Sequence, residues 1–127
     1  MVIPSLIRKG EQAGKGGTMN VWGDGSPIRD LIYAEDVARG MIHMVENKIT
    51  KPVNLGSGTG VTIREIAEII AEYFGKEIEW DITKPMGDMK RLMSMDRAKS
   101  YGFTPTTELK DGIVKTIEWY KENKDVL

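Results

Sequence analysis

The sequence contains no cysteine and a single histidine, His43. Without cysteine the chain can form no disulfide, use no thiolate nucleophile and bind no zinc through sulfur. One histidine also cannot supply the several imidazole ligands of a histidine-rich metal centre. Cysteine chemistry and histidine-rich metal sites are therefore excluded.

The sequence also lacks an excess of either charge and any long hydrophobic run. Its 18 lysines and arginines balance 19 acidic residues, which leaves a net charge of −1 and indicates no nucleic-acid or anionic-membrane partner. No stretch approaches the roughly 20 apolar residues that a membrane span requires. Residues 1–9 lack the basic-then-apolar order of a signal peptide. We therefore expect a cytoplasmic protein without a membrane or nucleic-acid partner.

What remains is the composition of an ordinary globular protein, with 40% hydrophobic and 29% charged residues. A chain of 127 residues is long enough for one domain with a real core but too short for two ordinary domains. We predict a single domain covering residues 1–127.

Apolar periodicity and turn-forming residues predict an α/β fold, with a few short strands, some of them parallel, covered by four or five helices. The expected helices are residues 2–13, Glu35–Asn47, the segment from an N-cap at Thr62 to Phe74, Asp96–Tyr101 and Glu108–Asn123. The expected strands are Met19–Trp22, Leu31–Tyr33, Pro52–Leu55 and Glu77–Asp81, and residues 82–95 are expected to form a loop.

Two of these helices carry further signals. Thr62 and Glu65 form a capping box, Val61 and Ile66 form a hydrophobic staple, and Gly75 ends the same helix. The helix Glu35–Asn47 has a single apolar stripe of the kind that an amphipathic helix buries, made by Val37, Ala38, Met41, Ile42 and Val45.

Residues 21–36 are the most informative segment. A Gly-Asp-Gly-Ser-Pro turn at residues 23–27 follows a short apolar strand and leads to Arg29. An arginine held between a rigid turn and a strand suits a phosphate, because its guanidinium group offers a planar fork of donors. Spacing alone favours the alternative, in which Arg29 is a surface residue paired with Asp24 or Asp30.

The segment from Trp22 to Asp36 resembles the motif that links core and substrate domain in the extended short-chain dehydrogenases, the NAD-dependent epimerases, dehydratases and reductases of nucleotide sugars. In that family the arginine of the motif binds the diphosphate of the sugar nucleotide, which implies this role for Arg29. Trp22 matches a tryptophan that stands beside the substrate in GDP-fucose-synthase-like enzymes, where a flat indole could stack on a sugar or base. The resemblance extends from Val2 to the last helix.

Residues 80–91 resemble the loop that closes over the nucleotide in the same subfamily, whose pattern is Asp-x-(Ser/Thr)-Lys-Pro-x-Gly. The resemblance implies that Lys84 lies near the diphosphate or ribose, and the alternative is a solvated loop lysine. Lys90 and Arg91 are weaker candidates. Lys9 aligns with a phosphate-contacting arginine on the first helix, although the neighbouring Arg8 could serve instead.

Three other motifs favour structural interpretations. The run Gly56–Gly60 precedes a helix, but Val61 stands where a dinucleotide fingerprint needs its last glycine, so a turn is expected. Tyr120 and Lys124 match the catalytic Tyr-x-x-x-Lys pair of short-chain dehydrogenases by letter, but Tyr120 lies on an apolar stripe at the end of the chain. His43 is expected to be a surface or boundary residue.

The resemblance implies the C-terminal, substrate-binding portion of a Rossmann-type extended short-chain dehydrogenase. We expect a nucleotide-diphosphate sugar as ligand, bound by Arg29, Trp22, Lys84 and Lys9. NAD(P) is expected in the parent enzyme, which catalyses redox or epimerisation, but we expect no cofactor, metal ligand or catalytic residue in this chain alone. Exposed core faces should favour homo-oligomers. The alternative is a non-catalytic orphan or truncated domain that acts as a binding or self-association module.

Overall fold

A computed structural model describes residues 1–126; Leu127, the last residue of the predicted domain, lies outside the described residues. The helices are α1 (Val2–Gln12), α2 (Ala34–Glu46), α3 (Ile63–Phe74), α4 (Asp96–Ser100), α5 (Leu109–Asn123) and a short 3-10 helix, η1 (Lys124–Val126). The strands are β1 (Thr18–Trp22), β2 (Ile28–Asp30), β3 (Gly60–Thr62) and β4 (Glu77–Asp81). The predicted α/β class is confirmed. Within residues 1–126, no helix combines the length and apolar character needed to cross a membrane.

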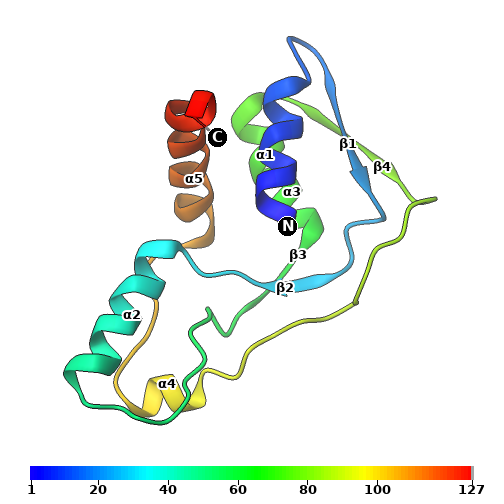
Figure 1. Ribbon diagram of the computed structural model, residues 1–127. Helices are drawn as coiled ribbons and strands as arrows, with labels where there is room; N and C mark the ends of the chain where they lie inside the picture. Colours follow the sequence, from blue (N-terminus) through cyan, green and yellow to red (C-terminus); the bar gives the residue numbers. More distant parts are fainter. Residues whose placement is uncertain (127) are drawn as a thin grey trace.

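Helix α3 is the centre of the larger core (Figure 1). Its ends are fixed locally: Thr62 and Glu65 exchange the two hydrogen bonds of the predicted capping box, and Gly75 ends the helix with a φ of 64°. Apolar side chains at a spacing of three or four residues give α3 a buried face, made by Ile63, Ile66, Ala67, Ile70 and Ala71. Residues of α1, β1, β4 and α5 complete the core around this face.

The strands form two separate pairs. β1 runs parallel to β4, with Val21 opposite Trp80, and β2 runs antiparallel to β3, with Arg29 opposite Val61. The parallel pair agrees with the predicted partly parallel strands. The turn at residues 23–27 connects the two pairs, so Trp22 and Arg29 lie at its two ends.

Helices α2 and α4 belong to a smaller second core, which Figure 1 shows apart from α1, α3 and α5. Its buried members are Met44, Met95, Ala98 and Phe103. Long extended segments connect the two cores (Figure 1). The chain therefore has two hydrophobic cores. The predicted binding residues lie on the side of the larger core.

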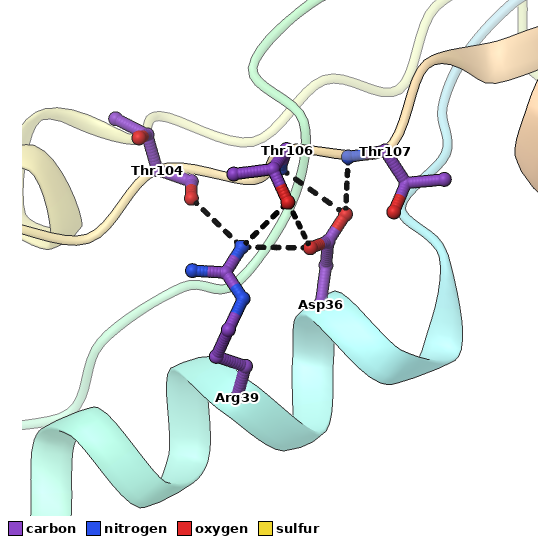
Figure 2. Close-up of polar contacts among 5 residues, drawn as sticks. All are labelled: Asp36, Arg39, Thr104, Thr106 and Thr107. Atoms are coloured by element: carbon purple, nitrogen blue, oxygen red, sulfur yellow. Dashed lines mark hydrogen bonds and ion pairs between the residues drawn. The ribbon is translucent and has the colours of Figure 1, made fainter.

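A buried carboxylate joins α2 to the segment that precedes α5. Asp36 is 3% exposed and accepts hydrogen bonds from the side chain of Arg39 at 2.7 Å and the backbone N–H of Thr107 at 2.9 Å (Figure 2). Thr106 adds longer bonds from its N–H and hydroxyl. Burial alone would raise the pKa of Asp36, but these hydrogen bonds outweigh burial and hold the pKa far below 3.8.

Two predicted strands are wrong. Leu31–Tyr33 forms no strand; the strand is Ile28–Asp30, because these residues pair with β3. Pro52–Leu55 forms no strand and pairs with none in the part of the chain that the structure describes. Apolar composition indicated both strands, but a strand also needs a partner for its backbone.

The apolar stripe predicted on α2 exists but is not buried. The helix buries Asp36, Gly40 and Met44 instead. Three members of the stripe are largely exposed, namely Met41 at 60%, Ile42 at 58% and Val45 at 78%. Periodicity identifies an apolar face, but it does not show whether another part of the chain covers that face.

Candidate functional site

The four predicted binding residues lie close together beside the turn at residues 23–27. Lys9, Trp22 and Arg29 line one pocket of about 280 Å³. The Nζ atoms of Lys9 and Lys84 stand 5.7 Å and 5.6 Å from the centre of the Trp22 ring, within the range of cation–π attraction. Lys84 is not a lining residue itself, but Pro85 beside it is. The structure thus gathers these residues, and their binding role stays a prediction.

The surroundings of this pocket are positively charged. Its lining contains Lys9 and Arg29 and no carboxylate, and the remaining lining residues are apolar apart from Ser5. The ion pairs found within residues 1–126 involve neither of these two residues nor Lys84. An anionic group entering the pocket would therefore meet cationic side chains without displacing a carboxylate.

Arg29 is half-buried and held by carbonyl oxygens. Its Nη1 donates to the carbonyl oxygens of Ile28 and Asp88, each at 2.8 Å. Its Nε and Nη2 have no hydrogen-bond partner in the described residues. A guanidinium group fixed through one nitrogen thus keeps a planar pair of donors available, which is the geometry that binds a phosphate with two parallel hydrogen bonds.

The alternative partners of Arg29 are engaged elsewhere. The Asp24 carboxylate accepts from the backbone N–H of Ser26 at 2.8 Å. The Asp30 carboxylate accepts from Ser57. The described residues therefore contain no ion pair between Arg29 and either aspartate.

Arg64 and Trp80 hold the turn that precedes Arg29. Arg64 donates from Nη2 to the carbonyl oxygen of Asp24 at 2.6 Å, and its guanidinium carbon lies 4.5 Å from the Trp80 ring centre. Gly25 has a φ of +81°, and a side chain there would collide with Trp80 and Arg64, so the position requires glycine. The sequence did not indicate that Arg64 and Trp80 hold this turn. The local signal was Gly25, because a glycine in a turn allows other side chains to approach the backbone closely.

The loop at residues 82–95 runs past the pocket and is attached to β2. The N–H of Ile28 donates to the carbonyl oxygen of Met89 at 2.8 Å, and the N–H of Arg91 donates to the carbonyl oxygen of Ile28 at 3.0 Å. Arg91 forms an ion pair with Asp88. Neither Arg91 nor Lys90 lines the pocket.

The glycine-rich run Gly56–Gly60 binds a side chain of the protein itself. The Asp30 carboxylate accepts from the N–H of Ser57 at 2.6 Å, the hydroxyl of Ser57 at 2.7 Å and the N–H of Gly58 at 3.0 Å. Burial opposes ionisation of Asp30, but these bonds outweigh burial and lower its pKa from 3.8. The donors that a phosphate would need here are occupied, in agreement with the predicted turn.

The remaining motifs also make structural contacts. Tyr120 packs against the larger core, and Lys124 Nζ binds Glu11 Oε1 at 2.6 Å. The Nε2 of His43 lies 2.6 Å from the carbonyl oxygen of Tyr101. None of these residues lines the pocket, and no group of acidic or histidine side chains within residues 1–126 is arranged to hold a metal ion.

The same fold occurs in solved epimerase and reductase structures. A GDP-L-fucose synthetase from Naegleria fowleri bound to NADP matches 98% of the chain with a TM-score of 0.88 and 25% identity. The epimerase Mth375 from Methanothermobacter thermautotrophicus matches 99% with a TM-score of 0.82 and 27% identity. The chain covers 41% and 38% of those two chains. Its fold is thus that of part of a Rossmann-type epimerase or reductase.

Sequence comparison agrees with the structural match. The sequence profile of the NAD dependent epimerase/dehydratase family matches residues 1–56. GDP-L-fucose synthase 1 of Arabidopsis thaliana is 39% identical over 96% of the chain, and the GDP-L-fucose synthase of Escherichia coli (strain K12) is 32% identical over 98%. The chain covers 39% and 43% of these relatives, about two fifths of their length. The predicted resemblance is confirmed: the chain matches part of an extended short-chain dehydrogenase of this family, with GDP-L-fucose synthases among its relatives.

Proposed function

We propose that this chain is the nucleotide-sugar-binding portion of a GDP-fucose-synthase-like, NAD(P)-dependent reductase or epimerase, and that its ligand is a GDP-linked sugar. The observation that carries this proposal is the pocket lined by Lys9, Trp22 and Arg29 and by no carboxylate, with Lys84 beside the Trp22 ring. Relatives named for GDP-linked sugars support the choice of base, among them a GDP-mannoheptose C4 reductase from Campylobacter jejuni with 28% identity and a TM-score of 0.78.

In this proposal each residue has a distinct task. The Nε and Nη2 atoms of Arg29 bind the diphosphate with two parallel hydrogen bonds. Lys84 approaches the same charge from the loop, and Lys9 approaches it from α1. Trp22, which is 55% exposed, offers a flat apolar surface to the sugar or the base.

We further propose that residues 1–127 alone bind the ligand without converting it. The glycine-rich run Gly56–Gly60 is occupied by Asp30, and Lys124 is paired with Glu11 instead of activating Tyr120. We therefore expect these residues to hold no cofactor and to carry out no hydride transfer from NAD(P)H.

Calorimetric titration with GDP-, UDP- and dTDP-linked sugars tests the function. We expect measurable binding that is strongest for the GDP-linked sugar and weakens with added salt, because phosphate contacts between exposed charges are screened. We also expect the absorbance of NADPH to stay constant when a keto-sugar nucleotide is added. Absence of binding to all three nucleotides, or steady consumption of NADPH, would contradict the proposal.

A second candidate function, self-association, is favoured by the exposed face of α2. Met41, Ile42 and Val45 form a contiguous apolar surface on one side of this helix, and such surfaces are typical of interfaces. We propose that a second copy of the chain covers this face. The segment Pro52–Leu55, which has no strand partner within residues 1–126, offers backbone groups to the same kind of contact.

Light scattering measures this association directly. We expect a mass above that of the 14.2 kDa monomer, and we expect the double variant Ile42→Asp/Val45→Asp to return the mass to that of the monomer. Glu118→Lys changes the charge of an exposed site on α5 and is expected to leave the mass unchanged. A strict monomer at high concentration in the unmodified protein would refute the interface.

A further inference from the structure

Asp30 lies at a junction of three segments of the chain. It ends β2, and its carboxylate binds the turn at residues 56–60 through Ser57 and Gly58. The same carboxylate accepts a hydrogen bond from the N–H of Met93, in the loop at residues 82–95, at 3.2 Å. One side chain therefore connects the strand that carries Arg29 to the loop that carries Lys84.

The two neighbours on β2 hold the same loop in different ways. Successive residues of a strand point to opposite faces, and Arg29 binds the carbonyl oxygen of Asp88 while Asp30 binds the N–H of Met93. The backbone of Ile28, which precedes them, exchanges hydrogen bonds with Met89 and Arg91 of the loop. The loop is thus attached to β2 along residues 88–93.

The other end of the loop is attached to the turn beside Trp22. The carbonyl oxygen of Asp81 accepts from the N–H of Gly23 at 2.8 Å. Residues 82–87, which include Lys84, span the gap between these two attachments. Next to the first attachment, the N–H of Lys84 donates to the carbonyl oxygen of Asp81 at 3.3 Å. The position of Lys84 relative to Arg29 therefore depends on this contact and on how residues 88–93 are held.

The two side-chain attachments differ in their relation to the pocket. Arg29 lines the pocket and Asp30 does not. The bond to Asp88 comes from the same guanidinium group that is proposed to bind the diphosphate. The bond from the N–H of Met93 to Asp30 involves no residue that lines the pocket and can hold the loop throughout binding.

We propose that Asp30 is a positioning residue of the nucleotide-sugar site, which holds the loop at residues 82–95 so that Lys84 meets the diphosphate bound by Arg29. This inference rests on the proposed function. In this role Asp30 makes no contact with the ligand, because Asp30 affects ligand binding through the position of Lys84.

A double-mutant cycle between Asp30 and Lys84 tests this assignment. Asp30→Asn keeps the shape of the side chain but replaces one acceptor oxygen with a donor. We expect Lys84→Ala alone to weaken the affinity for a GDP-linked sugar about fivefold, as for a partly exposed ionic contact. Asp30→Asn should weaken the affinity about as much. The double variant should lose no more than about a further twofold in affinity, because a Lys84 already displaced by Asp30→Asn no longer contacts the diphosphate.

Hydrogen exchange locates the change in the structure. We expect faster amide exchange in residues 82–95 of Asp30→Asn and unchanged exchange in α3 and α5. Met93→Pro removes the N–H donor on the loop, although it also fixes φ at this position, and is expected to reproduce both effects while leaving the Asp30 side chain intact. Asp96→Asn is the matched control, because its carboxylate is exposed and has no hydrogen-bond partner in the described residues.

The outcomes distinguish failure of the proposed function from failure of the role of Asp30. If the unmodified protein binds no nucleotide sugar, the proposed function fails and this inference fails with it. If the unmodified protein binds but Lys84→Ala costs the same in both backgrounds, only the role of Asp30 is refuted. Unchanged exchange of residues 82–95 in Asp30→Asn and Met93→Pro also refutes it.

Discussion

We expect that replacing Arg29 with alanine weakens the binding of a GDP-linked sugar by about tenfold or more. The reason is the loss of a charge-assisted contact, which is worth roughly 1.5–3 kcal/mol. Arg29 is held by two carbonyl oxygens, so its free Nε and Nη2 donors are oriented before the ligand arrives. Calorimetric titration of the variant and the parent measures the difference.

Two further variants make this result specific to the guanidinium fork. Arg29→Lys keeps the positive charge but loses the planar pair of donors, so we expect an intermediate affinity. Arg8→Ala removes an arginine that is next to Lys9 but does not line the pocket, and we expect the parental affinity. If Arg29→Ala binds as tightly as the parent, the diphosphate role of Arg29 is wrong.

We expect that replacing Asp36 with alanine destabilises the fold by about 3 kcal/mol, because removing one member of a buried ionic network leaves its partners without compensation. The backbone N–H groups of Thr106 and Thr107 lose their acceptor (Figure 2). Arg39, whose side chain is 48% exposed, can be solvated after the change, so Arg39→Ala should cost only about 1 kcal/mol. Urea unfolding with an unchanged m-value measures both losses.

The same carboxylate predicts how stability depends on pH. Because the pKa of Asp36 is lower in the folded chain than its ordinary value of 3.8, the stabilisation is fully present above that value and is lost as the pH falls below it. Between neutral and acidic pH, the free energy of unfolding should therefore fall less in Asp36→Asn than in the parent. Glu118→Gln, on an exposed face, should follow the parental profile. A parental profile for Asp36→Asn would show that the network contributes little.

Local features of this fold could be predicted from the sequence. The capping box at Thr62 and the glycine cap at Gly75 need only neighbouring residues, and both are present in the structure. The turn before Arg29 was also recognisable, since its glycines and proline constrain the backbone directly. The gathering of Lys9 and Lys84 around Trp22 was implied by a family resemblance and not by any spacing in the chain.

The features that the sequence did not reveal depend on distant partners. Asp36 lies in the predicted helix Glu35–Asn47, but two of the backbone N–H groups that donate to its carboxylate, those of Thr106 and Thr107, lie about 70 residues away. Asp30 was considered only as a partner for Arg29, and its actual partners are in the turn and loop that follow much later. The exposed stripe on α2 and the unpaired segment Pro52–Leu55 show the same limit, since periodicity does not say what covers a face.

The parallel pairing of β1 with β4 has a consequence for how the molecule forms. Met19 lies opposite Ile78, so this contact closes a loop of roughly 60 residues. The chain loses conformational entropy when this loop closes, before the contact contributes any stabilisation. Helix α3 needs only its own residues and can form early. We therefore expect β1, which ends in Trp22, to take its place late in folding, after α3 has formed.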